Sequence, residues 1–394
     1  MSPKPPIFTK PFIAVSLINL LIMIAYYMLF IISGPYAKTS FSTSPSMAGL
    51  VAGLMVLGSC IGRFSSGHLI SKTSCKTMLM AGLLVYTVSM ALYLVANTLP
   101  LFCVVRLISG IGVGFIGNST GTLIADIVPP SRRGLGISYF SLSTIIALAM
   151  GPFCGIFLTQ RVSFETIFIL CTATGIASII LIYAMNLQNV VTECKLKTSL
   201  LSVHNYLELA VVPLSLVVLL VGFCWGNVQA FMSEYSNQIN LVWAASVFFL
   251  VYGAVVFITR PLTGRIFDKH GANWIIPPSL LSLSAGLMML GLAGESWMML
   301  TAGALIGAGY GNFQSTGQAL SLKMVDPQRY PQTTSTFFIF LDLGIGFGPY
   351  LLGFFQPLIG YSGLYFFCSG LAFIIIPIYA VVCRNATKAQ QTNT

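Results

Sequence analysis

Two ionisable residues, Arg106 and Asp342, stand inside long apolar stretches of the sequence. A charge in such a stretch is costly in a membrane, so it is kept where it has a partner, a water-filled cavity or a proton to exchange. The other eight acidic residues fall in polar stretches or near the ends of apolar ones. We therefore predict that Asp342 binds a proton or a cation, and that Arg106 has a partner or a water-filled cavity beside it. A structural role for either residue, bonded to neighbouring helices, is the alternative.

Residue patterns typical of catalysis do not occur in the sequence. The three histidines are far apart, and the nine cysteines include no C-x-x-C pair. The sequence also lacks the G-x-S-x-G, H-E-x-x-H and G-x-x-x-x-G-K patterns of hydrolases, metalloproteases and nucleotide-binding loops. We therefore expect no enzymatic activity, no metal and no cofactor, and we interpret the cysteines as small packing residues.

The elements that position Arg106 and Asp342 follow from the composition. Of 394 residues, 56% are hydrophobic and 7% are charged, against about 45–50% and 25% in soluble domains, and the mean hydropathy is +0.89. A bilayer-spanning helix needs about 20 apolar residues, whereas a membrane strand needs only about 9–11. We predict an all-α membrane protein with twelve transmembrane helices, at about 11–33, 46–69, 76–97, 99–122, 133–158, 164–187, 209–233, 241–263, 274–294, 297–321, 332–356 and 360–383.

The basic residues indicate the orientation of these spans. The formal net charge is +10, with 19 Lys and Arg. With the amino terminus inside the cell, every basic residue except Lys38, Arg106 and Arg161 falls on the cytoplasmic side, as the positive-inside rule requires. We expect both termini in the cytoplasm and a bacterial-type inner membrane. The basic excess then reflects topology and predicts no nucleic-acid partner.

The two halves of the sequence repeat at an offset of 197 residues. Gly67 and Lys72 match Gly264 and Lys269, and three further sites keep the same offset. These are the glycines at 110, 112 and 114 (matching 307, 309 and 311), the V-x-P-x-R at 128–132 (matching 325–329), and the Gly-Pro pairs at 151–152 and 348–349. Six spans separate the copies, so both halves cross the membrane in the same direction. The predicted domains are a six-helix bundle at 1–187, a cytoplasmic linker at 188–208 and a second bundle at 209–394.

Three motifs carry a resemblance to a known family. GRIFDKHG at 264–271 resembles a family loop motif, RLISGIGVG at 106–114 resembles a motif of the fourth span, and GPFCG at 151–155 is similar to the antiporter signature of the fifth. Together, these motifs resemble the major facilitator superfamily over nearly the whole chain, and in particular its drug:proton antiporters. The segment 335–349 resembles that of exporters that include metallophore exporters.

The resemblance implies that Arg106 takes part in proton coupling, since similar antiporters carry an Arg at the matching motif position. It implies roles for further residues as well. Spans 1, 4, 7 and 10 would line a central cavity, to which we assign Asn19, Tyr26, Tyr27, Trp225, Asn227, Gln229, Glu234, Asn312, Gln314 and Gln318. Gating loops and hinges would involve Gly67, Lys72, Gly264, Arg265, Asp268, Lys269, Gly151, Pro152, Gly348 and Pro349. Ser71 stands where the motif has an acid, so the first-half loop lacks a charge that Asp268 supplies in the second. Core packing is the alternative for the aromatic residues, and a solvated loop acid for Asp268.

The function that these observations predict is secondary active transport. We expect proton-coupled export of a small organic molecule by alternating access, either a drug-like compound or a metabolite such as a metallophore or siderophore. Uptake of a small polar metabolite or sugar is the alternative, and a non-transporting membrane sensor is a further one. The expected partners are the small-molecule substrate, protons and the lipid bilayer, with the protein acting as a monomer.

Overall fold

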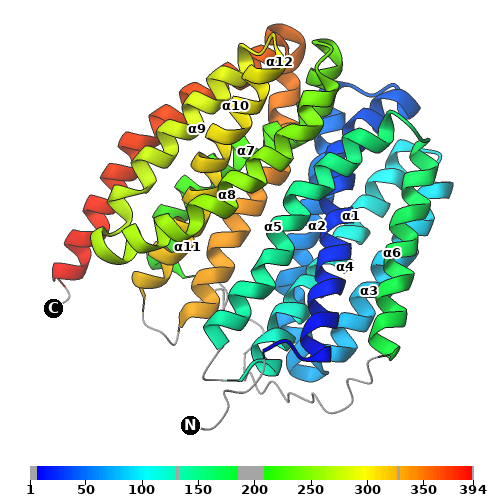
Figure 1. Ribbon diagram of the computed structural model, residues 1–394, viewed down its shortest axis with the longest axis horizontal. Coiled ribbons are helices and arrows are strands. Elements are labelled where there is room, and N and C mark those ends of the chain that lie inside the picture. The colour runs from blue at the N-terminus through cyan, green and yellow to red at the C-terminus, as the bar shows by residue number, and fades with distance from the viewer. Residues whose placement is uncertain (1–6, 130–132, 185–207, 326–328, 393–394) are drawn as a thin grey trace. The chain divides into compact units, whose positions relative to one another are not determined.

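The computed structural model describes residues 7–129, 133–184, 208–325 and 329–392, which are almost entirely helical and contain no strand. The main helices (Figure 1) are α1 (Lys10–Phe41), α2 (Pro45–Lys72), α3 (Cys75–Leu92), α4 (Leu99–Ile127), α5 (Arg133–Thr159), α6 (Phe164–Ala184), α7 (Val212–Gln238), α8 (Val242–His270), α9 (Ile276–Gly291), α10 (Ser296–Ile306), α11 (Asn312–Lys323) and α12 (Tyr330–Thr392). Nearly all of the predicted linker lies outside the described residues.

The helices account for the twelve predicted spans. In the described residues, ten helices are long and apolar enough to cross a membrane. The longest, α12, contains the predicted spans 332–356 and 360–383, one on each side of Gly360. The predicted span 297–321 is divided into α10, a π-helical turn at Gly307–Gly311, and α11. The prediction of an all-helical, multi-pass membrane protein is therefore confirmed.

The helix α12 reverses its direction at Gly360. Its φ of 69° and ψ of 177° lie outside the helical region, in a conformation that residues with a Cβ rarely adopt. The two arms of α12 join there without a loop, and Figure 1 shows α12 turning back on itself in the orange and red part of the chain.

The GRIFDKHG motif is helical, which corrects the predicted loop. α8 runs to His270 and α2 to Lys72, so both copies of the motif form the last turns of a helix. Nothing in the motif breaks a helix before Gly271, whose φ of 81° ends α8. The N–H of Gly271 donates to Phe267 O at 3.0 Å. On the first-half side, Ser74 caps α3 by accepting a hydrogen bond from Thr77 N at 3.1 Å.

Contacts divide the chain into two units, and the division passes through α1 and α2. The first unit is Met1–Phe30 with Leu54–Leu200, and the second is Ile31–Gly53 with Leu201–Thr394. The end of α1 and the start of α2, residues 31–53, thus pack with the second half of the sequence. We call this segment the 31–53 hairpin. The predicted domain boundaries remain a prediction.

In the first unit, three glycines let α4 approach two neighbours closely. Gly110 and Gly114, one helical turn apart, face the backbone of α2, where a Cβ would collide with Met55 O and Ser59 O. Gly112 lies on the other side, and its Cβ would stand 2.8 Å from Tyr86 N on α3. Small residues at such contacts allow helices to pack tightly in a membrane.

The second unit repeats these contacts at the same offset of 197 residues. A Cβ on Gly307 would lie 2.8 Å from Tyr252 O, and one on Gly309 would lie 2.5 Å from Leu283 N. Tyr252 and Leu283 are the counterparts of Met55 and Tyr86. The repeat found in the sequence is therefore a repeat of helix contacts, with the fourth span of each half packed between the second and third.

We predict that Gly114→Ala destabilises the protein, because the added methyl group would collide with Ser59 O and force α4 away from α2. Overpacking of this kind costs about 1–3 kcal/mol. The matched control is Gly121→Ala in the same helix, where a Cβ meets nothing within 4 Å. Thermal unfolding of the purified protein in detergent should show a lower Tm for the first variant only. Equal Tm values would contradict the close contact.

Candidate functional site

An aromatic stack lies in the second unit, around Trp225 of α7. The Trp225 ring is stacked between Tyr252 of α8 and Tyr310, with ring centroids 4.7 and 4.6 Å apart. Trp225 is only 1% exposed. Both faces of the indole are covered, so the stack joins three helices of this unit and Trp225 does not present an open face to a ligand.

The π-helical turn carries Tyr310 into this stack. Turns of this kind occur mostly inside α-helices and often at functional sites. The matching residues of the first half, 110–114, are α-helical throughout. After the turn, the Asn312 amide donates to Thr259 Oγ1 at 3.1 Å and to Ala308 O at 2.9 Å. The π-helical turn is therefore a difference between the predicted span 297–321 and its counterpart in the first half, α4.

The other predicted cavity residues lie in separate places. In the first unit, the Asn19 amide donates to Ser143 Oγ at 2.8 Å and to Thr144 Oγ1 at 3.1 Å, which joins α1 to α5. Tyr26 and Tyr27 contact each other, with ring centroids 5.1 Å apart. In the second unit, Asn227 and Gln229 are buried, whereas Gln314 and Gln318 are partly exposed.

Two of the buried amides have polar atoms without a hydrogen-bond partner among the described residues. These atoms are Nδ2 and Oδ1 of Asn227 and Nε2 of Gln229. A buried amide without partners is costly, and such groups in proteins are usually satisfied by water or by a ligand. The two residues therefore remain candidates for contact with a polar ligand.

Arg106 is fully buried in the first unit. Its Nη1 donates to Leu29 O and to Met55 Sδ, both at 3.4 Å. These atoms belong to α1 and α2, so the guanidinium on α4 lies where three helices of this unit meet. The sequence located the buried charge correctly but did not indicate these contacts.

Asp342 is buried on the first arm of α12, with 6% of its surface exposed. The arm packs against α7, since a Cβ on Gly222 would lie 2.7 Å from Leu341 O. Gly344 and Gly348 face α7 as well, against Leu219 and Phe223. Asp342 therefore lies well inside the helix, in the stretch of α12 that packs closely on α7.

The predicted hinge and gate residues fall into three groups. The Gly-Pro pairs lie inside helices, with Gly151 against α1 and Gly348 against α7. Arg265, Gly264 and Lys269 are exposed on the last turns of α8. The side chains at 67–72 and of Asp268 lie outside what the structure describes, so the gating role of Gly67, Lys72 and Asp268 stays a prediction.

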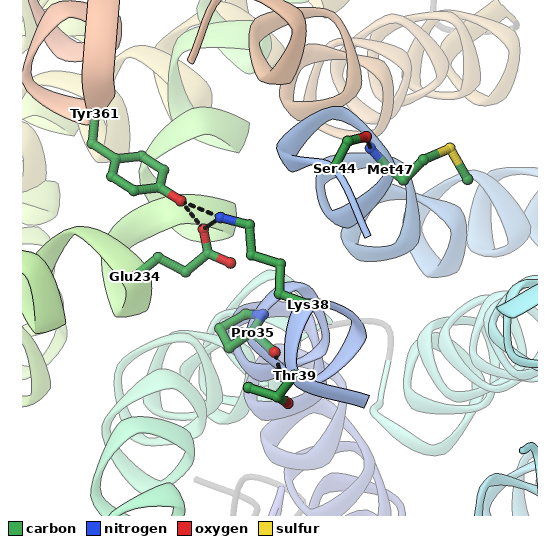
Figure 2. A network of polar contacts seen from close by, with 7 residues as sticks. All are labelled: Pro35, Lys38, Thr39, Ser44, Met47, Glu234 and Tyr361. Atoms are coloured by element: carbon green, nitrogen blue, oxygen red, sulfur yellow. Dashed lines mark hydrogen bonds and ion pairs between the residues drawn. The ribbon is translucent and has the colours of Figure 1, made fainter. Parts of the chain in front are cut away.

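A charged cluster that the sequence did not indicate joins the 31–53 hairpin to the second half. Figure 2 shows Lys38 of α1 next to Glu234 of α7 and Tyr361 of α12. Lys38 Nζ lies 2.9 Å from Glu234 Oε2 and donates to the Tyr361 hydroxyl at 2.6 Å. The same hydroxyl donates to Glu234 Oε2. The partners are 196 and 323 residues from Lys38, and no local pattern predicts such a pairing.

A second ion pair lies at the opposite end of α7. The Arg329 guanidinium binds the Glu208 carboxylate, and Glu208 N donates to Thr336 Oγ1 at 2.8 Å. Arg329 is part of the repeated sequence, but the sequence suggested no partner for it. This pair fixes the start of α7 to the start of α12.

A family model shows what this arrangement of helices is. The model of the Major Facilitator Superfamily matches residues 15–193 and 214–394. The chain belongs to this superfamily. Its members transport small molecules across membranes, so the protein is a multi-pass membrane transporter and not an enzyme.

Relatives in the superfamily are distant. An uncharacterised transporter of Methanocaldococcus jannaschii is 22% identical over 86% of this chain and 89% of its own length. The multidrug resistance protein MdtG of Klebsiella pneumoniae is 25% identical over 62% of this chain and 61% of its own. The arabinose-proton symporter of Bacillus subtilis is 27% identical over 34% of this chain and 30% of its own.

Solved structures show the same fold. A peptide transporter, POT, in complex with sulfate aligns with a TM-score of 0.79 at 13% identity, covering 98% of this chain and 96% of its own. The nucleoside transporter NupG aligns with a TM-score of 0.76 at 10% identity, covering 94% and 99%. At this identity, the likeness supports the fold and does not indicate the substrate.

We predict that Trp225→Ala lowers the free energy of unfolding of this transporter by about 3–5 kcal/mol, the usual cost of removing a large buried aromatic side chain. The substitution would leave Tyr252 and Tyr310 without their shared partner. The control is Trp243→Ala, because Trp243 is exposed. Thermal unfolding in detergent should separate the two variants. A similar small effect from both would mean that the stack does not hold the three helices together.

Proposed function

We propose that this transporter exports a small organic molecule in exchange for protons, and that Asp342 carries the proton. The observation that carries the proposal is one carboxyl buried well inside a membrane helix. Burial disfavours the charged form of a carboxyl, so proton uptake there changes the energy of the site. Its counterpart in the first half is Ile145, so the acid is an addition to the repeated scaffold. The protein would act as a monomer in a bacterial inner membrane with both termini inside.

The 31–53 hairpin supports alternating access. Its backbone packs closely on the first arm of α12, with Gly53 against Gly346 and Gly49 against Pro349. Ser46 Oγ also donates to Tyr350 O at 3.0 Å. In the proposed topology the hairpin faces outside, so these contacts would close the outer side of the transporter. Such contacts must open and close in each transport cycle.

The MdtG relatives favour export, whereas the arabinose-proton symporter favours uptake. The MdtG proteins are named as multidrug resistance proteins, and the Gly-Pro pair in α5 is similar to the antiporter signature. The arabinose-proton symporter supports proton coupling but suggests sugar uptake as the second candidate. The symporter match spans a third of this chain, so we rank export first.

Inside-out membrane vesicles test this proposal. We expect drug-like compounds or metallophores to accumulate in them when the interior is acidic, and to stop accumulating when an uncoupler collapses the gradient. The control vesicles come from cells without the protein. Sugar uptake into right-side-out vesicles driven by external acid would instead favour the symport alternative.

We predict that Asp342→Asn abolishes proton-driven accumulation while leaving the protein folded. The amide keeps the shape and hydrogen bonding of the carboxyl group but cannot exchange a proton. The measurement is transport in inside-out vesicles across a pH series, beside exchange of labelled for unlabelled substrate without a gradient. Exchange should persist in the variant. If uphill transport persists with an unshifted pH profile, Asp342 has a structural role.

A further inference from the structure

The Lys38 ammonium group is surrounded by side chains of the kinds that bind amines in proteins. It is 2.9 Å from Glu234 Oε2 and 2.6 Å from the Tyr361 hydroxyl, and its nitrogen is 5.3 Å from the centre of the Tyr361 ring. The Phe231 ring lies next to that ring, with centroids 5.6 Å apart. A carboxylate, a hydroxyl and aromatic rings are groups that bind a primary ammonium.

Glu234 needs a cation close to it. It lies four residues before Gln238, the last residue of α7, where the helix dipole presents partial negative charge. Its side chain is only 10% exposed. A buried carboxylate at the carboxyl end of a helix is costly when ionised unless a positive group lies next to it. In the structure, Lys38 supplies that positive charge.

The carboxylate also has an unused acceptor. Lys38 and Tyr361 both bind Oε2, whereas Oε1 is buried and has no hydrogen-bond partner among the described residues. Lys38 is more exposed than Glu234, at 27% against 10%. Lys38 is therefore the more accessible of the two partners, and Glu234 and Tyr361 both belong to the second half of the sequence.

Lys38 belongs to the other half of the sequence. It is in the last turn of α1, on the 31–53 hairpin. In the proposed transport cycle this hairpin moves away, so Glu234 and Tyr361 would stay together on α7 and α12 while the carboxylate would lose the ammonium. A ligand that brings the same group would restore the lost contacts.

We propose that Glu234 and Tyr361 bind the primary ammonium group of a substrate, and that Lys38 competes with the substrate for this site. This inference rests on the proposed transport cycle, and it names the substrate class as primary amines. A quaternary ammonium would lack the N–H donors that both oxygens accept. A neutral amide would lack the charge that Glu234 requires.

Binding of a matched pair of fluorescent probes tests the proposal. The probes are dansylcadaverine, which carries a primary amine, and its N-acetylated form, which is neutral. Binding to the purified full-length protein in detergent is measured by fluorescence titration. We expect Lys38→Met to bind the amine at least tenfold more tightly than the wild type, with no change for the acetylated probe. Lys38→Arg keeps a competing cation and should bind the amine like the wild type.

Adding Glu234→Gln to the Lys38→Met variant should remove the gain, because the amide cannot pair with the ammonium. Tyr361→Phe in the wild-type background should weaken amine binding severalfold and leave the acetylated probe unchanged. Unchanged amine affinity in folded Lys38→Met protein, or equal changes for both probes, would overturn the proposal. If Lys38→Met does not fold, equal effects of Tyr361→Phe on the two probes would overturn it instead.

The assay separates this inference from the proposed function, because it measures binding without a proton gradient. Selective amine binding with no proton-driven export in vesicles would contradict the transport proposal alone. Proton-driven export of neutral compounds with no amine selectivity would contradict the amine site alone.

Discussion

Close backbone contact between helices is the constraint on which this structure depends. In lipid, apolar side chains gain little by leaving the solvent, so helices associate through close packing and hydrogen bonds. Glycines at 110 and 114 provide that approach in the first half, and their counterparts do so in the second. The same device holds the first arm of α12 against α7 and against the 31–53 hairpin. Larger side chains at these positions would push α4, which carries Arg106, away from α2, and the first arm of α12, which carries Asp342, away from α7.

Within this repeated scaffold, the two halves differ where chemistry is expected. Arg106 has a glycine as its counterpart, and Asp342 has an isoleucine. In the part of the chain that the structure describes, the π-helical turn before Asn312 and the stack around Trp225 occur only in the second half. The shared scaffold thus sets the helix contacts, while residues present in one half supply charge and aromatic surface.

Hydropathy was sufficient to predict the spans, because length and apolarity alone decide whether a helix can cross a bilayer. The offset of 197 residues predicted two equivalent halves, and the helix contacts of Gly112 and Gly309 repeat at that offset. The loop predicted at GRIFDKHG was wrong, because a motif rich in polar residues can still continue a helix until a glycine with positive φ ends it. The pairing of Lys38 with Glu234 could not be predicted, because it depends on how residues 196 positions apart come together.

The turn at Gly360 has a mechanical consequence. Two arms of α12 meet at one residue, with no loop to absorb a displacement. Asp342 lies on one arm, and Tyr361 is the first residue of the other. A tilt of the first arm would therefore displace the second arm as well, because no loop between them can take up the movement. If Asp342 and the Glu234–Tyr361 site act as proposed, the proton site and the ammonium site would be linked mechanically through Gly360.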